Sequence, residues 1–204
     1  MISNIVFDLG KVLIAYDPGG YLERHFSDPK LRDRLMHAVF LSQSWQDDDA
    51  GKYPEEQILQ GFIRNAPDLE NEIRLVYEET GETIEAFPYA IPWLQSLAEK
   101  GYRLYGLSNY SKHTYDRSKQ KLTFLNLLNG MLFSWECRLA KPDPAIYKHF
   151  LEKFSLSAET CIFIDDMPAN IEAAQKQGFQ GILFRTQAQA RHDLDELLAV
   201  DGSV

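Results

Sequence analysis

Five short apolar runs, separated by segments with helical spacing, constrain the fold of this chain more than any other feature of its sequence. The runs are residues 5–9, 104–107, 131–133, 162–164 and 181–184. Apolar runs of this length are typical of strands that are buried on both faces, and strands that alternate with helices form parallel sheets. The sequence therefore predicts an α/β protein built on a parallel sheet.

Residues 18–86, between the first two runs, have no comparable strand signal and are rich in charge and helical spacing. We expect three helices there, over residues 31–40, over residues 55–64 and after Asp68. The sequence thus predicts an inserted α-helical cap, residues 18–86, and a core of residues 1–17 and 87–204. We expect a frayed tail after Val200.

Composition excludes several classes of function. The chain has 204 residues, 45% of them hydrophobic, which suffices for one core and a smaller inserted unit without disulfides. A net charge of -9 argues against binding to nucleic acid, which needs clustered Lys and Arg. The chain shows no leader signal and no apolar window of about eighteen residues, so we expect a cytoplasmic protein that does not bind membranes.

Polar or acidic residues stand where three of the predicted strands end. The first run ends in Asp8-Leu9-Gly10, the second is followed by Ser108-Asn109, and the fourth by Asp165-Asp166. Ligands of open parallel sheets bind beyond the carboxyl ends of the strands. Lys141 precedes a helix that Pro144 can open, which places the lysine beside the same edge. We expect these side chains to form one site.

The charges of this edge predict a magnesium site. Two carboxylates about 4 Å apart repel each other by roughly 4 kcal/mol at an effective dielectric constant near 20. Asp8, Asp165 and Asp166 therefore need a cation, and Mg²⁺ is commonly held by one or two carboxylates together with water and a substrate phosphate. Lys141 adds a positive charge for the phosphate, and Ser108 and the backbone near Asn109 add hydrogen-bond donors.

In these features the chain resembles the haloacid dehalogenase-like hydrolases with a helical cap and a Rossmann-like core. Four motifs occur in the order typical of that family, and within it they most resemble those of bacterial sugar-phosphate phosphatases that act on alpha-D-glucose 1-phosphate. The motifs are Ile5-Val6-Phe7-Asp8-Leu9-Gly10-Lys11-Val12, Gly106-Leu107-Ser108-Asn109, Lys141-Pro142, and Phe163-Ile164-Asp165-Asp166 with Asn170.

The resemblance implies a role for each matching residue. Asp8 would attack phosphorus and form an aspartyl-phosphate. Asp8, the carbonyl of Gly10 and Asp166 would bind Mg²⁺, with Asp165 touching the metal or its waters and Asn170 behind them. The phosphoryl oxygens would be held by Ser108, Asn109 and Lys141. The substrate would be a small phosphorylated metabolite, with a sugar phosphate favoured, and the protein a monomer or homodimer.

Two positions depart from the family pattern. Most phosphatases of the family carry an acid/base aspartate two positions after the nucleophile, where this chain has Gly10. Such proton transfer contributes about 10² to 10⁴ in rate. A substitute could be a metal-bound water or one of four aspartates, Asp17, Asp47, Asp48 and Asp49. Lys11 stands where the family more often has Gly or Asn, and could reach the substrate or pair with a cap carboxylate.

The sequence also allows simpler interpretations and other functions. Residues 47–49 are expected to form a solvated turn, Trp45 is expected in the core, and Lys11 and Tyr16 are candidates for substrate contact. One alternative is a 2-haloacid dehalogenase, whose metal-free site would gain nothing from paired Asp165 and Asp166. The other is a non-catalytic protein that binds a phosphorylated ligand or a protein partner, which Gly10 and Lys11 would suit.

Overall fold

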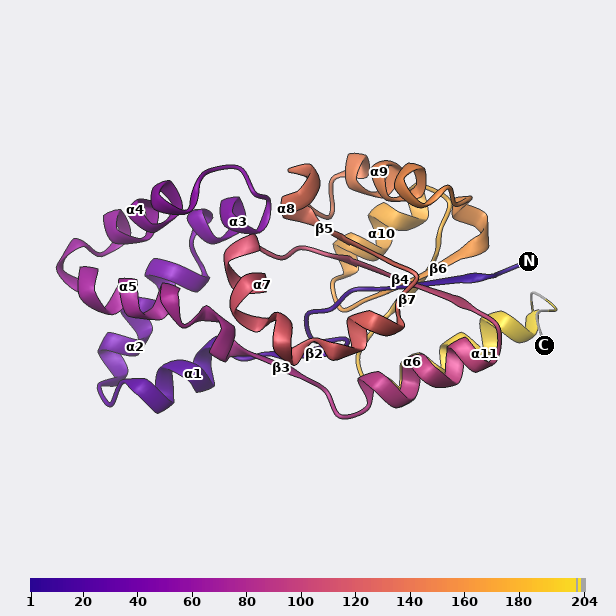
Figure 1. The fold of residues 1–204 in the computed structure, drawn as a ribbon, viewed down its shortest axis with the longest axis horizontal. Coiled ribbons are helices and arrows are strands. Elements are labelled where there is room, and N and C mark those ends of the chain that lie inside the picture. Colours follow the sequence, from indigo (N-terminus) through magenta and orange to yellow (C-terminus); the bar gives the residue numbers. More distant parts are fainter. Residues whose placement is uncertain (201, 203–204) are drawn as a thin grey trace.

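A five-stranded parallel sheet forms the centre of the computed structural model, which describes residues 1–200 and 202. Its strand order is β5-β4-β1-β6-β7. Figure 1 shows the sheet nearly edge-on, so that its strands overlap. The strands are β1 (Asn4–Phe7), β4 (Arg103–Ser108), β5 (Gly130–Phe133), β6 (Cys161–Asp165) and β7 (Gln180–Leu183). The prediction of a Rossmann-like parallel core is confirmed. Positions 201, 203 and 204 of the predicted tail lie outside the described residues.

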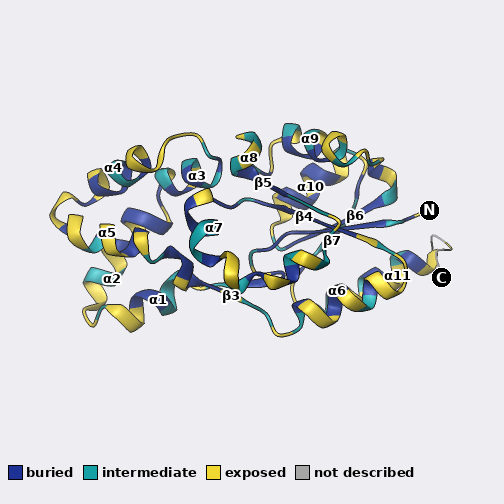
Figure 2. Ribbon diagram, viewed as in Figure 1, coloured by how far each residue is buried: buried dark blue, intermediate teal, exposed yellow. Residues whose placement is uncertain are grey.

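Helices cover both faces of this sheet because its strands point apolar side chains to either side. In β1, Ile5 and Phe7 join one hydrophobic cluster and Val6 joins another. Helices α6 (Ala90–Glu99) and α11 (Gln187–Val200) pack on the first face, and α9 (Pro144–Phe154) and α10 (Pro168–Lys176) pack on the second. Every residue of β1 and β6 is buried, so the carboxyl ends of these strands are firmly positioned. Figure 2 shows that dark blue, the colour of buried residues, predominates at the centre of the sheet.

The region between β2 and β3 is helical and has a hydrophobic cluster of its own. Its side chains include Leu22, Val39, Phe62 and Ile73. The helices are α1 (Pro18–His25), α2 (Pro29–Leu35), which continues as a π-helix (Met36–Phe40), α3 (Gln43–Asp49), α4 (Glu55–Asn65) and α5 (Glu70–Glu78). The division into a cap of residues 18–86 and a core of residues 1–17 and 87–204 stays a prediction. Across residues 1–200 and 202, no helix combines the length and apolar character that crossing a membrane requires.

Two features of this region differ from the sequence prediction. Strand β3 (Ile84–Ala86), expected to be part of the helical region, pairs antiparallel with β2 (Ile14–Tyr16) where the chain leaves and re-enters the core. Such three-residue strands carry almost no periodic signal of their own. Residues 47–49 do not form a solvated turn but end helix α3, and Asp48 is buried there.

Candidate active site

A cavity of about 320 Å³ opens at the carboxyl ends of β1, β4 and β6. It is lined both by these strand ends and by residues of the helical region, among them Trp45 and Asp49. Most of the predicted site residues line it together: Asp8, Gly10, Ser108, Asn109, Lys141, Asp166 and Asn170. Asp165 is fully buried beside them. The strand ends and the helical region therefore enclose these residues in one concave cavity.

Asp8, directly after β1, is held by β6 and by Lys141. Its backbone N–H donates to the carbonyl of Ile164 at 2.9 Å, and its Oδ1 lies 2.9 Å from Lys141 Nζ. Burial raises the pKa of the Asp8 carboxyl to about 6, against the opposing effects of Lys141 and of a hydrogen bond from Ser108. A buried carboxylate with one ammonium beside it and an open cavity in front is suited to act as a nucleophile.

Lys141 uses all three of its ammonium protons inside the protein. Its Nζ donates to the carbonyl of Leu107 at 2.9 Å, to Asp165 Oδ2 at 2.7 Å and to Asp8 Oδ1 at 2.9 Å. Burial alone would lower the pKa of Lys141, but Asp8 and Asp165 raise it above its usual value. The ammonium therefore stays charged and bridges the ends of three strands.

The Asn109 side chain positions Lys141. Its Nδ2 donates to the Lys141 carbonyl at 2.9 Å, and its Oδ1 accepts the Lys141 N–H at 2.8 Å. This paired contact occupies Oδ1 and one of the two Nδ2 hydrogens, so the amide group is fixed in orientation and keeps one N–H to donate. Asn109 was expected from the sequence among the phosphate-binding residues, and its side chain has this additional task.

Asp165 is saturated with hydrogen bonds. Besides Lys141, it accepts from Asn170 Nδ2, which is 3.0 Å from each oxygen, and from the Met167 N–H at 2.8 Å. The Asn170 carbonyl in turn accepts from Tyr147 Oη at 2.9 Å. Asp165 and Asn170 therefore hold Lys141 and the loop after β6 in place.

Asp166 is only half-buried and faces the cavity. Lys11 Nζ lies 3.8 Å from its Oδ2, so Lys11 pairs with a carboxylate that follows β6 and not with one from the helical region. Burial and the neighbouring Asp165 raise the Asp166 pKa, and Lys11 lowers it. Lys11 has a φ of 59°, in the left-handed region that Gly and Asn adopt most easily, which explains why those residues suit this position.

The donor set of this site fits magnesium. Asp8, Asp165 and Asp166 each offer a carboxylate oxygen, and these oxygens lie within 4.8 Å of one another. Because the Asp165 oxygens are already engaged, Asp8 and Asp166 are the carboxylates free to bind an ion at the cavity, next to Gly10. Hard oxygen ligands that leave room for water and a phosphate are the preference of Mg²⁺.

Aromatic and aliphatic side chains form much of the rest of the cavity wall. Tyr16 and Trp45 are stacked, with ring centroids 6.1 Å apart. Trp45, expected in the core, also packs on Phe40 at 5.0 Å, so it belongs to both the hydrophobic cluster and the cavity. The remaining apolar lining comes from Ile14, Ile84, Tyr110 and Met167.

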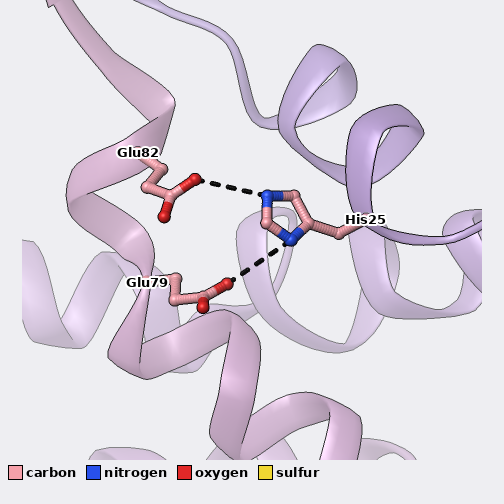
Figure 3. A group of neighbouring side chains, drawn as sticks. All are labelled: His25, Glu79 and Glu82. Carbon is pink, nitrogen blue, oxygen red and sulfur yellow. Dashed lines mark hydrogen bonds and ion pairs between the residues drawn. The ribbon is translucent and has the colours of Figure 1, made fainter.

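A second group of metal-ligating side chains, His25, Glu79 and Glu82, lies in the helical region (Figure 3). The two nitrogens of the His25 ring face different carboxylates, Nδ1 at 3.6 Å from Glu79 and Nε2 at 3.2 Å from Glu82. Tyr21 Oη also donates to Glu79 at 2.7 Å. These groups pair with one another and connect α1 to the end of α5, a structural role that needs no ion.

The buried position of Lys141 predicts a large loss of stability in Lys141→Met. The substitution leaves Asp8 and Asp165 buried without their ammonium, and breaking a buried pair in this way costs about 3–5 kcal/mol. Lys153→Met is the control, because the Lys153–Glu136 pair is partly exposed and such pairs contribute less than about 1 kcal/mol. Denaturant unfolding would compare the two variants, and equal losses would contradict the bridging role of Lys141.

Several proteins are similar to this chain in sequence over most of its length. The chain matches the haloacid dehalogenase-like hydrolase family over residues 3–178. It is 30% identical over 218 residues to Phosphatase MT3486 from Mycobacterium tuberculosis, covering 99% of this chain and 98% of that protein. It is 23% identical to sesquiterpene phosphatase astK from Aspergillus oryzae, covering 87% of each. It spans only 37% of the length of drimenol cyclase drtB from Aspergillus calidoustus.

Solved structures share the fold as well. A HAD family enzyme from Bacteroides thetaiotaomicron, in complex with magnesium and inorganic phosphate, superposes with a TM-score of 0.73 at 20% identity, covering 92% of this chain and 96% of that one. L-2-haloacid dehalogenase from Xanthobacter autotrophicus superposes with a TM-score of 0.65 at 17% identity, with 92% and 80% covered. At these identities the likeness concerns the fold alone. The match over residues 3–178 shows that the chain belongs to the haloacid dehalogenase-like hydrolase family.

Proposed function

We propose that this protein hydrolyses small phosphate monoesters with Mg²⁺, through an aspartyl-phosphate on Asp8. The observation that carries this proposal is the pairing of a buried Asp8 with Lys141 Nζ at 2.9 Å, at the floor of an open cavity that Asp166 also lines. Relatives named as phosphatases support the reaction, and the magnesium and phosphate in a structural relative support the ion.

In the first step of the proposed reaction, a carboxylate oxygen of Asp8 forms a bond to phosphorus as the bond to the leaving-group oxygen breaks. The Lys141 ammonium, whose protons are held by the protein, stabilises the negative charge of the phosphoryl oxygens through its positive charge beside Asp8, and the Ser108 hydroxyl adds a hydrogen-bond donor. Asp165 keeps Lys141 in position for this task. Magnesium bound by Asp8, Asp166 and the carbonyl of Gly10 would supply further positive charge. Water then releases phosphate from Asp8.

We further propose that the leaving group is small, with a sugar phosphate as the first candidate. A cavity of about 320 Å³ is at the lower end of the range for small-molecule sites, about 300–1,000 Å³. The stacked rings of Tyr16 and Trp45 offer an apolar surface for one face of a ring-shaped leaving group. The sugar itself is supported only by the motif resemblance.

Neither alternative function is favoured by a specific contact. A metal-free dehalogenase would leave three carboxylates, Asp8, Asp165 and Asp166, with only Lys141 and the exposed Lys11 to balance their charge. A protein that only binds phosphorylated ligands has no need of a buried nucleophile, Asp8, paired with Lys141. Chloride release from 2-chloropropionate in the presence of chelator would favour the dehalogenase. Tight binding of a sugar phosphate, without phosphate release over many hours, would favour the non-catalytic binding protein.

A substrate panel tests the proposed function and the cavity wall together. We expect p-nitrophenyl phosphate and hexose phosphates to be hydrolysed faster than phosphopeptides. Tyr16→Ala should lower kcat/KM for ring-shaped leaving groups by about two- to twelvefold, the equivalent of about 0.5–1.5 kcal/mol of aromatic contact. Lys11→Ala should instead alter the magnesium concentration that gives half-maximal activity, the magnesium midpoint, because Lys11 faces Asp166.

Tyr53→Ala is the control for this panel, because Tyr53 is exposed and outside the cavity. Its selectivity and magnesium midpoint should match those of the parent protein. The proposal of a small substrate would be wrong if phosphopeptides were cleaved far faster than every small metabolite.

A further inference from the structure

The proposed reaction lacks a proton donor at the position where the family usually has one. An ideal Cβ on Gly10 would lie 4.0 Å from Asp8 Oδ2, so a side chain at this position would stand beside the nucleophile. Glycine leaves that space without a functional group. If the proposed function holds, a proton for the leaving-group oxygen must therefore come from another group at the cavity, either a metal-bound water or one of the four aspartates.

The structure distinguishes the four aspartates that the sequence left as candidates. Asp17 caps helix α1 by accepting the Gly20 N–H at 2.8 Å, and Asp47 pairs with Lys52 at 2.9 Å. Asp48 is buried within the helical region, 3.5 Å from Tyr77 Oη. Of the four, Asp49 alone lines the cavity that contains Asp8.

Asp49 is held in this position by the core. It is the last residue of α3, and its carbonyl accepts a hydrogen bond from the Ser134 hydroxyl at the end of β5. The same hydroxyl oxygen accepts the Tyr110 N–H at 2.9 Å. Just beyond Asp49, Gly51 has a φ of 60°, and an ideal Cβ there would come 2.9 Å from the Trp135 Cα. The close approach that glycine permits lets the end of α3 dock at the strand ends.

The surroundings of the Asp49 carboxyl favour its protonated form. Burial, the neighbouring Asp48 and Asp8 of the core together raise the pKa of Asp49 to about 8, against a hydrogen bond from the Ser111 backbone N–H. The phenols of Tyr16 and Tyr110 are the other titratable groups that interact with it. Asp49 also lines a neighbouring hollow of about 400 Å³, which gives it access to water for proton exchange.

We propose that Asp49 is the general acid and base of this enzyme, in the role that position 10 cannot fill. As the Asp8 oxygen bonds to phosphorus and the P–O bond to the leaving group breaks, the proton of the Asp49 carboxyl passes to the leaving oxygen and an alcohol departs. Ionised Asp49 then takes a proton from water, whose oxygen bonds to phosphorus. Phosphate leaves, the Asp8 carboxylate is restored, and Asp49 is again protonated.

Two substrates with a similar ring and different leaving groups test this role in Asp49→Asn. The p-nitrophenolate ion is stable enough to leave without a proton. The leaving group of benzyl phosphate is a benzyl alkoxide, which must take up a proton to depart as benzyl alcohol. In the first turnover, measured by rapid quench, we expect the variant to release benzyl alcohol about 10²- to 10⁴-fold more slowly than the parent protein. p-Nitrophenol should still appear as a burst at a rate within tenfold of the parent, followed by slow turnover, because Asp49 also serves the second step.

The pH profile gives a second readout. Because the donor must carry a proton, release of benzyl alcohol by the parent protein should decline as the pH rises past about 8, and Asp49→Asn should lack this decline. Asp47→Asn, on the same helix but paired with Lys52, should resemble the parent in every measurement. Asp49→Ala provides the same comparison if the amide is not tolerated.

Equal loss with both substrates in the first turnover, or no loss with either, would overturn the role of Asp49. Those results would leave the proposed phosphatase activity intact, provided that the parent protein turns over and Asp8→Asn does not. Failure of the parent protein to release phosphate from either substrate would instead refute the proposed function on which this inference rests.

Discussion

Asp8→Asn is expected to lower turnover by at least about 10⁴-fold, the scale of loss that follows removal of a catalytic nucleophile. The amide has nearly the shape of the carboxylate but cannot attack phosphorus. Since burial already disfavours the charged form of Asp8, a neutral amide should not unfold the protein. Phosphate release from p-nitrophenyl phosphate measures the effect, and circular dichroism verifies the fold.

Asp195→Asn provides the matched control for this substitution. Asp195 is an exposed residue 3.5 Å from Lys100 and far from the cavity lining, so the same chemical change there should leave turnover unaltered. If Asp8→Asn retained activity within tenfold of the parent protein, Asp8 could not be the nucleophile.

Removal of magnesium should have the second-largest effect. The carboxylates of Asp8 and Asp166 share the cavity with an anionic substrate, and a bound ion is worth several kcal/mol at such a centre. A contribution of about 4 kcal/mol corresponds to a rate loss of about 10³-fold in chelator. Addition of Mg²⁺ should restore the rate. Asp166→Asn should raise the magnesium concentration that gives half of the maximal rate.

The second group of metal-ligating side chains supplies a control for the magnesium prediction. His25 pairs with Glu79 and Glu82 in the helical region, so His25→Ala should leave the magnesium midpoint of activity unchanged. Equal rates with magnesium and with chelator would contradict a metal-dependent mechanism. A large change of the magnesium midpoint in His25→Ala would mean that the ion needed for activity binds at His25, Glu79 and Glu82 and not at Asp8 and Asp166.

Much of the sheet and of the site could be predicted because both follow from short-range patterns. Buried parallel strands are continuous apolar runs, and the residues after them must meet at one edge, which brings Asp8, Ser108 and Asp166 together. The position of Lys141 next to Pro142 and before α9 is likewise local. These inferences need no knowledge of how the helical region packs.

The contribution of Asp49 could not be predicted in this way. Three consecutive aspartates look like a solvated turn, and only the contact between Asp49 and Ser134, 85 residues away in the chain, shows that the last of them reaches the site. The pairing of β2 with β3 is also long-range and too short to have a period. The hydrogen bonds that saturate Asp165 depend on the side-chain orientations of Lys141 and Asn170.

Trapping of the phosphoenzyme tests the central claim most directly. The protein would be mixed with p-nitrophenyl phosphate and Mg²⁺, quenched with acid within the first turnover, and digested for mass spectrometry. The account predicts one phosphoryl group on the peptide that contains Asp8, labile to hydroxylamine and missing in Asp8→Asn. A protein that turns over substrate with no label, or with the label on another residue, would contradict it.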